Sequence, residues 1–383
     1  MSAVCAPSRA TPPEYTLIRL VLYFLKLGTI GFGGPIALAG YMQRNLVDER
    51  KWFTEEEYLE GLALAQLAPG PLAAQLAMYL GYVRGGWLGA TLVGFTFIAP
   101  SFLMVVLLAL AYIRYGGLAW MQAVFYGIGA AVIGIIARSA WKLAKGTMKA
   151  DPLLWAIFFA LAISTAITEK EIVWLFLAGG AIALAVRSFP RKLGPVPMSA
   201  ALLAGGVGIS LGRFGEVLAF FAKAGLFVFG SGLAIVPFLH GGVVVEHHWL
   251  TERQFLDAVA VAMITPGPVV ITVGFIGFLV AGVSGAIAAS LGVFLPVYLV
   301  VVVVAPYYKR FARNPQLHAF VRGVTAAATG AIAGAVVVLA RRAIYDWVTL
   351  AVALVTAALL FRWKIPEPVL ILGAAVVGLA TFH

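Results

Sequence analysis

The sequence predicts an all-α polytopic membrane protein built from two inverted repeats that contain broken helices. Three observations lead to this prediction. Hydrophobic residues make up 62% of the 383 residues and charged residues only 11%, against about 25% charged residues in soluble domains, and the mean hydropathy is +0.99. Motifs of the first half return in the second half, and an extra apolar run separates the two copies. Repeats in such an apolar chain usually enclose a transport path.

The duplication has a nearly constant offset. Trp52-Phe53-Thr54-Glu55 returns as Trp249-Leu250-Thr251-Glu252, and Pro69-Gly70-Pro71 returns as Pro266-Gly267-Pro268, both 197 positions later (249−52 and 266−69). Farther along, the offset drifts to 196 and 195 and pairs Pro100 with Pro296, Gly127 with Gly323, Gly134 with Gly330 and Asp151 with Asp346. We therefore expect a first repeat at 15–187, a linker with an extra transmembrane helix at 188–212, and a second repeat at 213–383.

Each repeat carries six apolar segments, taking about 20 residues as the length that crosses a bilayer. In the first repeat these are 17–38, 57–83, 87–113, 119–141, 152–168 and 171–187. In the second they are 214–239, 254–281, 285–306, 317–340, 345–361 and 366–382, and the linker adds 196–211. Residues 1–14 have three prolines and no signal-peptide pattern, so we expect a disordered cytoplasmic lead-in.

The extra linker segment determines the relative orientation of the repeats. Six crossings would bring both repeats into the membrane from the same side, and a seventh inverts the second repeat, for about 13 spans in all. With the N-terminus inside, the basic residues at 138–149, 187–192, 309–313 and 362–364 are cytoplasmic, as the positive-inside rule requires. Arg341 and Arg342 lie on the wrong side in this topology.

The composition also excludes several classes of function. The net charge is +11, but the basic residues stand singly between apolar runs, so nucleic acid is not an expected partner. Cys5 is the only cysteine, which excludes internal disulfides and thiolate metal sites. No phosphate-binding loop is present, which excludes an ATP-driven pump. His247 and His248 lie beside Glu246 and could hold a metal only with further ligands from elsewhere, which the sequence does not show. We therefore expect no metal and no cofactor.

Glycines and prolines interrupt the first apolar segment of each repeat. They are Gly28, Gly31, Gly33, Gly34 and Pro35 in the first, and Gly225, Gly230, Ser231, Gly232 and Pro237 in the second. At such a break, free backbone N–H groups and the positive end of a half-helix can face a cavity and bind an anion. The alternative is that the glycines only allow helices to pack closely. Recurrence of the break in both repeats favours the anion site.

A second break is predicted in the next segment of each repeat. The prolines Pro69, Pro71, Pro266 and Pro268 flank Gly70 and Gly267 within apolar segments, where each proline removes a backbone donor. Irregular backbone at membrane depth lies inside protein or lines a watery cavity. Gln66, Gln75, Thr265 and Thr272 are the polar neighbours, and they could donate to an anion or simply link helices.

Four ionisable residues occupy matching places in the two repeats. Lys26 and Lys223 precede the glycine breaks; they could offset the charge of a dianion or extend to the membrane interface, and both alternatives stay open. Glu60 and Asp257 lie near the mouths of the broken helices. A carboxylate in a low dielectric could bind a coupled proton. The alternative is that these acids only stabilise the first turn of a helix by interacting with its dipole.

These motifs resemble the chromate ion transporter family in its long, two-domain form. The resemblance rests on Phe32-Gly33-Gly34-Pro35, Gln66, Pro69-Gly70-Pro71 and Gln75, and on Phe229-Gly230-Ser231-Gly232, Trp249-Leu250-Thr251 and Thr265-Pro266-Gly267-Pro268. It covers nearly all of the chain beyond residue 15. One departure is Ala73-Ala74, where small hydroxyl residues would be expected.

The resemblance implies a secondary active transporter that exports chromate across the bacterial inner membrane, driven by the proton-motive force. Its expected partners are a chromate-like or sulfate-like oxyanion, protons and the lipid bilayer. The alternatives are transport of sulfate or another oxyanion and a passive anion channel, although no charged pore ring is evident. A membrane enzyme would need a redox site that the sequence lacks. The oligomeric state is open, with a homodimer as one alternative.

Overall fold

The computed structural model describes residues 15–32, 34–115, 118–169, 173–187, 212–226, 228, 235–307, 314–363 and 365–381. Within these ranges all regular secondary structure is helical. The expected lead-in and the linker run 196–211 lie outside the described residues, as do Gly33, Gly230, Ser231 and Gly232. The prediction of an all-α protein is confirmed for the part of the chain that the structure describes.

The helices of the first repeat follow the predicted segments closely. They are α1 (Leu17–Ile30), α2 (Gly34–Met42), the π-helix η1 (Gln43–Glu49), α3 (Glu55–Leu67), α4 (Leu72–Tyr115), α5 (Ala119–Met148), α6 (Pro152–Thr168) and α7 (Val173–Arg187). The break predicted in the first segment falls between α1 and α2, and Pro35 is the second residue of α2.

The second repeat has the corresponding helices. They are α8 (Gly212–Leu226), α9 (Ile235–Leu239), the π-helix η4 (His240–Glu246), α10 (Glu252–Ile264), the short η5 (Val269–Ile271), α11 (Thr272–Val304), η6 (Ala305–Tyr307), α13 (Pro315–Ala343), α14 (Trp347–Arg362) and α15 (Glu367–Thr381). The break between α8 and α9 matches that between α1 and α2, and Pro237 lies within α9.

Local structure repeats in detail around the start of α3 and of α10. Thr54 and Thr251 are the N-caps, each in a capping box with the residue three positions on, so two backbone donors are satisfied at each helix start. Lys51 and His248 both have positive φ, 52° and 49°. A π-helix, which is a rare form, precedes each of these two residues. The acidic first turn expected after Thr54 and Thr251 is present in Glu55 and Glu252.

α4 and α11 each contain two predicted membrane segments joined by a sharp turn. The turn lies at Gly86 and Gly282, with φ of 57° and 63°, a region that favours glycine. A Cβ on Gly81 would collide with the carbonyl of Gly89. In a straight helix, residues eight positions apart are about 12 Å apart. The two parts of α4 therefore fold back on each other as a helical hairpin, and Gly277 and Gly285 make the same contact in α11.

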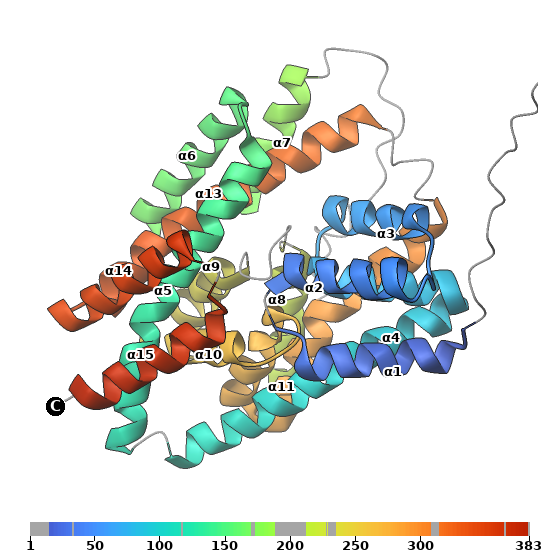
Figure 1. Ribbon diagram of the computed structural model, residues 1–383. Coiled ribbons are helices and arrows are strands. Elements are labelled where there is room, and N and C mark those ends of the chain that lie inside the picture. The colour runs from blue at the N-terminus through green and yellow to red at the C-terminus, as the bar shows by residue number, and fades with distance from the viewer. Residues whose placement is uncertain are drawn as a thin grey trace, which may run out of the picture.

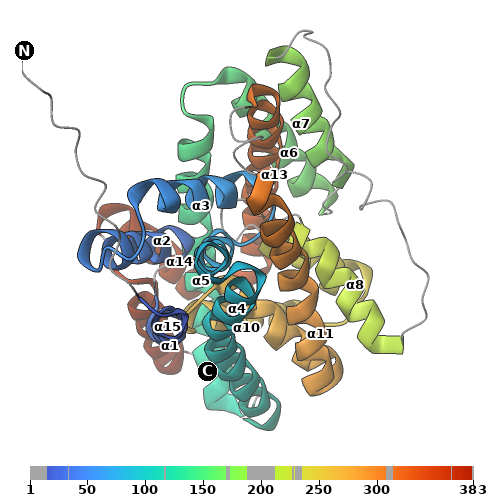
Figure 2. The same cartoon turned by 90° about the vertical axis from the view of Figure 1, so that its right-hand side faces the viewer.

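The two repeats exchange helices. The long helix α5 packs against α14 and α15 of the second repeat, and α13 packs against α6 and α7 of the first (Figure 1). Gly127 and Gly134 bring α5 close to the backbones of α15 and α14, and Gly323 and Gly330 do the same for α13 with α7 and α6. These two bundles contact each other through α5 and α13. Beside them α4 packs on α11, with α1 against α4 and α8 against α11 (Figure 2). The glycine pairs found in the sequence are thus sites of close helix packing.

The helices have the apolar character of membrane spans. In the described residues, four are long and apolar enough to cross a bilayer: Leu72–Tyr115, Ala119–Met148, Val269–Tyr307 and Pro315–Ala343. Large apolar side chains such as Phe95 (70%) and Trp174 (75%) are exposed, as expected for surfaces that face lipid. The chain is a multi-pass α-helical membrane protein, and the count of about 13 spans stays a prediction.

Candidate functional site

The two Pro-Gly-Pro motifs form irregular links between helices. α3 ends at Leu67 and α4 begins at Leu72, while α10 ends at Ile264 and η5 begins at Val269. Gly70 has φ of 138° and Gly267 has φ of 98°, values that L-residues with a side chain rarely adopt. Both glycines are buried. The prolines Pro69, Pro71, Pro266 and Pro268 thus lie where the sequence places the helix breaks.

Each Pro-Gly-Pro break is hydrogen-bonded to the glycine break of the other repeat. The Gly70 N–H donates to the carbonyl of Val228 (2.6 Å), and the Gly267 N–H donates to the carbonyl of Gly31 (2.7 Å). Val228 lies 197 positions after Gly31, as Gly267 does after Gly70. The two bonds are equivalent under the repeat. They join the four break segments in two pairs, each with one member from either repeat. Gly33 and Gly230 themselves lie outside the described residues.

Ser101 of α4 forms a hydrogen bond to the backbone of the second Pro-Gly-Pro break. Its Oγ is within hydrogen-bond distance of two carbonyl oxygens, those of Pro266 (2.7 Å) and Gly28 (3.2 Å), and the side chain is fully buried. A Cβ on Gly267 would collide with this hydroxyl. Ser101 therefore connects α1, α4 and the second-repeat break. Sequence reasoning missed it, although the pairing of Pro100 with Pro296 sets Ser101 opposite an apolar Val297.

Gln75 forms a hydrogen bond to the backbone of the first Pro-Gly-Pro break. Its Nε2 donates to the carbonyl of Pro69 (2.7 Å). The side chain is 1% exposed, and its Oε1 has no hydrogen-bond partner among the described residues. An amide nitrogen carries two hydrogens, so one bond to Pro69 leaves a second donor. Val297 packs against Gly70 where Ser101 packs against Gly267.

The other polar residues predicted at the site differ in placement. Thr265 and Thr272 are buried, and their hydroxyls donate to carbonyls of their own chain segment, Val261 (2.7 Å) and Val269 (2.8 Å). Gln66 is exposed. Gly34 is the first residue of α2. The described structure thus gathers Gly70, Gln75, Gly267 and the two threonines near the breaks.

Lys26 and Lys223 are exposed. On α1, Lys26 lies one turn from Leu22 and Ile30, which are 56% and 58% exposed, so all three share one face. Exposed apolar side chains on a membrane helix face lipid. This placement favours the alternative in which Lys26 extends to the membrane interface.

The matching carboxylates Glu60 and Asp257 are each bonded to a tyrosine. Asp257 is 4% exposed, and the Tyr112 hydroxyl donates to its Oδ2 (2.7 Å). Glu60 is half-buried, and the Tyr79 hydroxyl donates to its Oε2 (3.3 Å). The two tyrosines come from non-equivalent positions of the repeat, which explains why the alignment of the halves did not reveal them. Only Asp257 is withdrawn from solvent.

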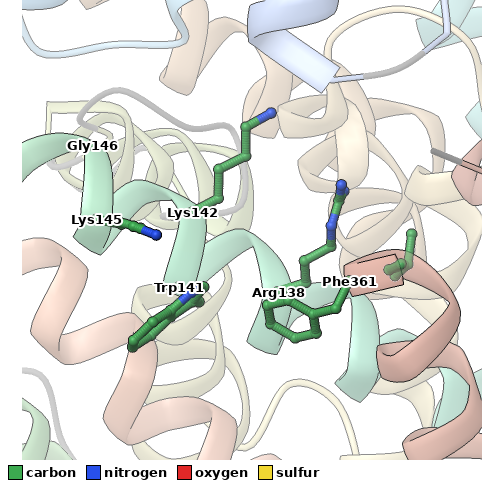
Figure 3. A pocket seen from close by; sticks show the side chains of 7 residues that line it. Arg138, Trp141, Lys142, Lys145, Gly146 and Phe361 are labelled. Carbon is green, nitrogen blue, oxygen red and sulfur yellow. The ribbon is translucent and has the colours of Figure 1, made fainter. Parts of the chain in front are cut away.

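An open pocket between α5 and the end of α14 is lined by Arg138, Lys142 and Lys145 (Figure 3). None of the predicted site residues lines it. It joins two segments that the positive-inside rule assigns to the cytoplasmic side, 138–149 and the end of α14. The pocket is therefore separate from the helix breaks.

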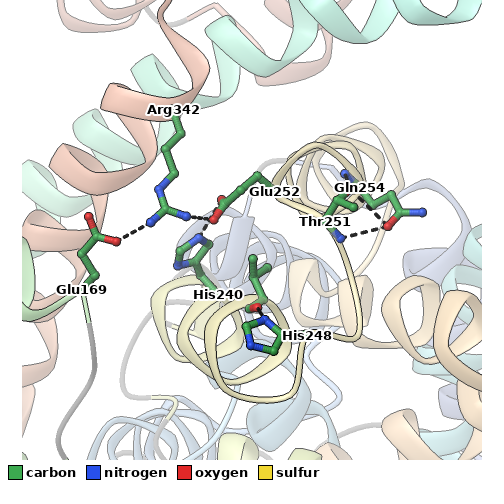
Figure 4. A network of polar contacts seen from close by, with 8 residues as sticks. Glu169, His240, His248, Thr251, Glu252, Gln254 and Arg342 are labelled. Atoms are coloured by element: carbon green, nitrogen blue, oxygen red, sulfur yellow. Dashed lines mark hydrogen bonds and ion pairs between the residues drawn. The ribbon is translucent and has the colours of Figure 1, made fainter.

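A charged network links the ends of α6, α10 and α13. Arg342 forms ion pairs with Glu169 and Glu252, and His240 Nε2 lies 2.8 Å from Glu252 Oε2 (Figure 4). Arg342 is thus neutralised by two acids, which explains why it departs from the positive-inside pattern. His240 lies just beyond the predicted span 214–239. Burial, aided by the Arg342 charge, lowers the pKa of His240 to about 4, so the ring is neutral at pH 7.

Paired, cross-connected helix breaks within a multi-pass α-helical protein define a membrane transporter architecture. The chain belongs to the chromate transporter family, whose model matches residues 18–184 and 215–379. These two matches correspond to the two repeats. The family assignment made from the motifs is therefore confirmed.

Relatives of nearly the same length share the similarity. The chain is 58% identical to the chromate transport protein of Cupriavidus metallidurans, over 98% of this chain and 96% of the relative. It is 56% identical to the probable chromate transport protein of Synechococcus elongatus, over 96% of each. The chromate transport protein of Pseudomonas aeruginosa is 30% identical over 99% of this chain and 96% of its own length. No solved structure matches the chain.

Proposed function

We propose that the chain is a secondary active transporter that exports chromate across the bacterial inner membrane, driven by the proton-motive force, and so confers chromate resistance. The identity of 58% to a chromate transport protein over 98% of the chain supports chromate as the substrate. The proposal extends this similarity to direction and energy source. Transport of sulfate or another oxyanion is the competing function.

The reciprocal hydrogen bonds between the breaks are the observation that carries the proposed site. The bonds from Gly70 to Val228 and from Gly267 to Gly31 each join a break of one repeat to a break of the other. Chromate is a tetrahedral dianion, and backbone N–H groups at helix starts stabilise negative charge without a buried cation. The proposed ligands are the N–H groups at Gly33-Gly34 and at Gly230 to Gly232, with Gln75 as a side-chain donor. Gln66, Thr265 and Thr272 complete the proposed lining. Lys26 and Lys223 are not assigned to it, because both are exposed and Lys26 shares a face with exposed apolar side chains.

Alternating access follows from inversion of the repeats. Two similar units related by a two-fold axis make every contact between them twice. The two hydrogen bonds between the breaks fit this symmetry, as does the packing of α5 and of α13 against helices of the other repeat. Rocking of one repeat against the other around the fixed breaks exposes the site to each side in turn. Inversion of the second repeat is the part of this proposal that depends on the linker segment.

Asp257 is the proposed carrier of the coupled proton. It is buried, and Tyr112 is the side chain that donates to it. Protonation removes a negative charge from the protein interior, so the carboxyl can exchange its proton as access alternates. Glu60 is the matching candidate in the first repeat.

Transport in reconstituted vesicles with an imposed pH gradient tests the proposal. We expect labelled chromate to accumulate only with the gradient, and an uncoupler to abolish accumulation. Sulfate added at the same concentration as chromate separates the two substrates, because a chromate transporter keeps most of its chromate flux under this competition. Flux that persists unchanged with the uncoupler would reject secondary transport in favour of a channel.

A further inference from the structure

We propose that the pocket between α5 and α14 binds the headgroup of an anionic phospholipid. The pocket encloses about 400 Å³ and opens to the surface. Its cations are Arg138, Lys142 and Lys145, which lie four and seven positions apart on α5 and so share one face of the helix. Figure 3 shows the three side chains projecting from α5 in different directions, with Phe361 of α14 in the same view.

Charge is the first argument for an anionic ligand. Three cations line the pocket, and Glu367 at the start of α15 is the acidic side chain that acts on Arg138 and Lys142. One acid leaves a surplus of two positive charges. Arg362, in the last turn of α14, is directed over the ring of Trp363 (5.8 Å). The uncompensated cations match the charge of a phosphodiester, which a lipid headgroup and free phosphate share.

Apolar side chains beside the cations distinguish a lipid from a soluble anion. Trp141 and Phe361 line the pocket and are 52% and 57% exposed. Leu354 lies seven positions before Phe361 on the same face of α14 and is 61% exposed. An aromatic side chain at the rim with an exposed apolar stripe beyond it fits a headgroup whose acyl chain runs along α14.

The position of the pocket fits the same ligand. It joins the basic segments at 138–149 and at the end of α14, which the positive-inside rule assigns to the cytoplasmic side. Basic pockets between membrane helices on that side bind anionic lipid headgroups, with about 1 kcal/mol from each Lys or Arg near the surface. That corresponds to about fivefold in affinity for each charge.

The test compares the binding of phosphatidylglycerol and phosphatidylcholine with identical acyl chains to the full chain in neutral detergent. We expect preferential retention of phosphatidylglycerol, measured by native mass spectrometry. The triple variant R138Q/K142Q/K145Q should bind it about 100-fold more weakly and K142Q about fivefold. The control R19Q/K51Q/R114Q removes the same charge from exposed residues elsewhere and should bind as the wild type does. K142Q alone is sufficient if the triple variant does not fold.

Three outcomes would overturn the proposal. Equal retention of the two lipids by the wild type would remove the charge preference. Equal loss in the control and in the triple variant would assign the effect to net charge. Inorganic phosphate is tested by itself, and phosphate binding that the triple variant loses, with lipid retention unchanged, would assign the pocket to a soluble anion.

Discussion

The two Pro-Gly-Pro breaks make equivalent backbone hydrogen bonds to the opposite repeat, but different side chains hold them in place. At the second break the Ser101 hydroxyl holds the Pro266 carbonyl, whereas at the first break Gln75 holds the Pro69 carbonyl and the apolar Val297 packs against Gly70. Ser101 comes from the first repeat and Val297 from the second, so each repeat supports the other's break. The comparison teaches that the backbone hydrogen bonds between the repeats are the same at the two breaks, while the polar side chains around the breaks have diverged.

Replacing the break glycines should have the largest effect. Gly267→Ala forces a side chain into a positive φ and against Ser101, and Gly70→Ala does so against Gln75 and Val297. Strain of about 1–3 kcal/mol at each site displaces the N–H that joins the repeats. We expect chromate transport in vesicles to fall to background in both variants. Gly40→Ala in α2 has open space around the new methyl group and should transport normally. Normal transport by Gly267→Ala would show that the break geometry is not needed.

The two carboxylates come next, because only Asp257 is fully buried. Asp257→Asn cannot ionise, so we expect it to lose accumulation driven by a pH gradient while retaining chromate exchange at equal pH on the two sides. Glu60→Gln, on the half-buried partner, should reduce accumulation by only a few-fold. Parallel flux assays with and without the gradient measure both. If Glu60→Gln were the variant that lost coupling, the proton role would belong to the first repeat.

Substitutions at Ser101 and at the equivalent Val297 test directly whether the two breaks depend on different side-chain contacts. Ser101→Ala leaves the buried Pro266 carbonyl without its hydroxyl donor, which costs about 1–3 kcal/mol, so we expect a clearly lower melting temperature and a several-fold lower rate of transport. Val297→Thr changes the equivalent position with nearly the same volume and adds a hydroxyl near Gly70. Its transport should change less than that of Ser101→Ala. Equal effects of the two changes would mean that both breaks depend on packing alone.

The smallest expected effect concerns His240, which differs in chemistry from its partner in the first repeat. That partner is Gln43 (240−43 is 197). Burial lowers the pKa of His240 to about 4, against about 6.5 in the unfolded chain. The unfolded state therefore binds more protons between these values, and stability is lost as pH falls from about 6.5 to about 4. His240→Gln, which installs the first repeat's residue, should flatten thermal unfolding over that window. An unchanged pH dependence would assign it to other groups.

Much of the fold was predictable because it follows from hydropathy and repetition. The segment predicted at 152–168 is α6 to the residue, and the Pro-Gly-Pro breaks lie where proline chemistry requires them. The hairpin turns at Gly86 and Gly282 fall in the gaps predicted between membrane segments, at 84–86 and 282–284. The packing of α5 and α13 against helices of the other repeat was not predicted, because it depends on tertiary structure. Tyr112 was not predicted at the site either, because it pairs with Asp257 across 145 residues.

The charged network shows why a topology rule alone was insufficient. The positive-inside rule counts Arg342 as an exposed cation on the wrong side. In the structure it is paired with Glu169 and Glu252, which come from different repeats, so its charge contributes little to orientation. Pairing across 173 residues cannot be read from local sequence.

The central claim is that the two breaks, joined across the repeats, form one chromate site. Calorimetric titration of chromate into the purified chain tests it most directly, with wild type, Gly70→Ala and Gly267→Ala compared side by side and Gly40→Ala as the control. A single shared site predicts one chromate bound per chain and loss of that binding in either break variant. Two chromates per chain, with one retained in each break variant, would contradict it.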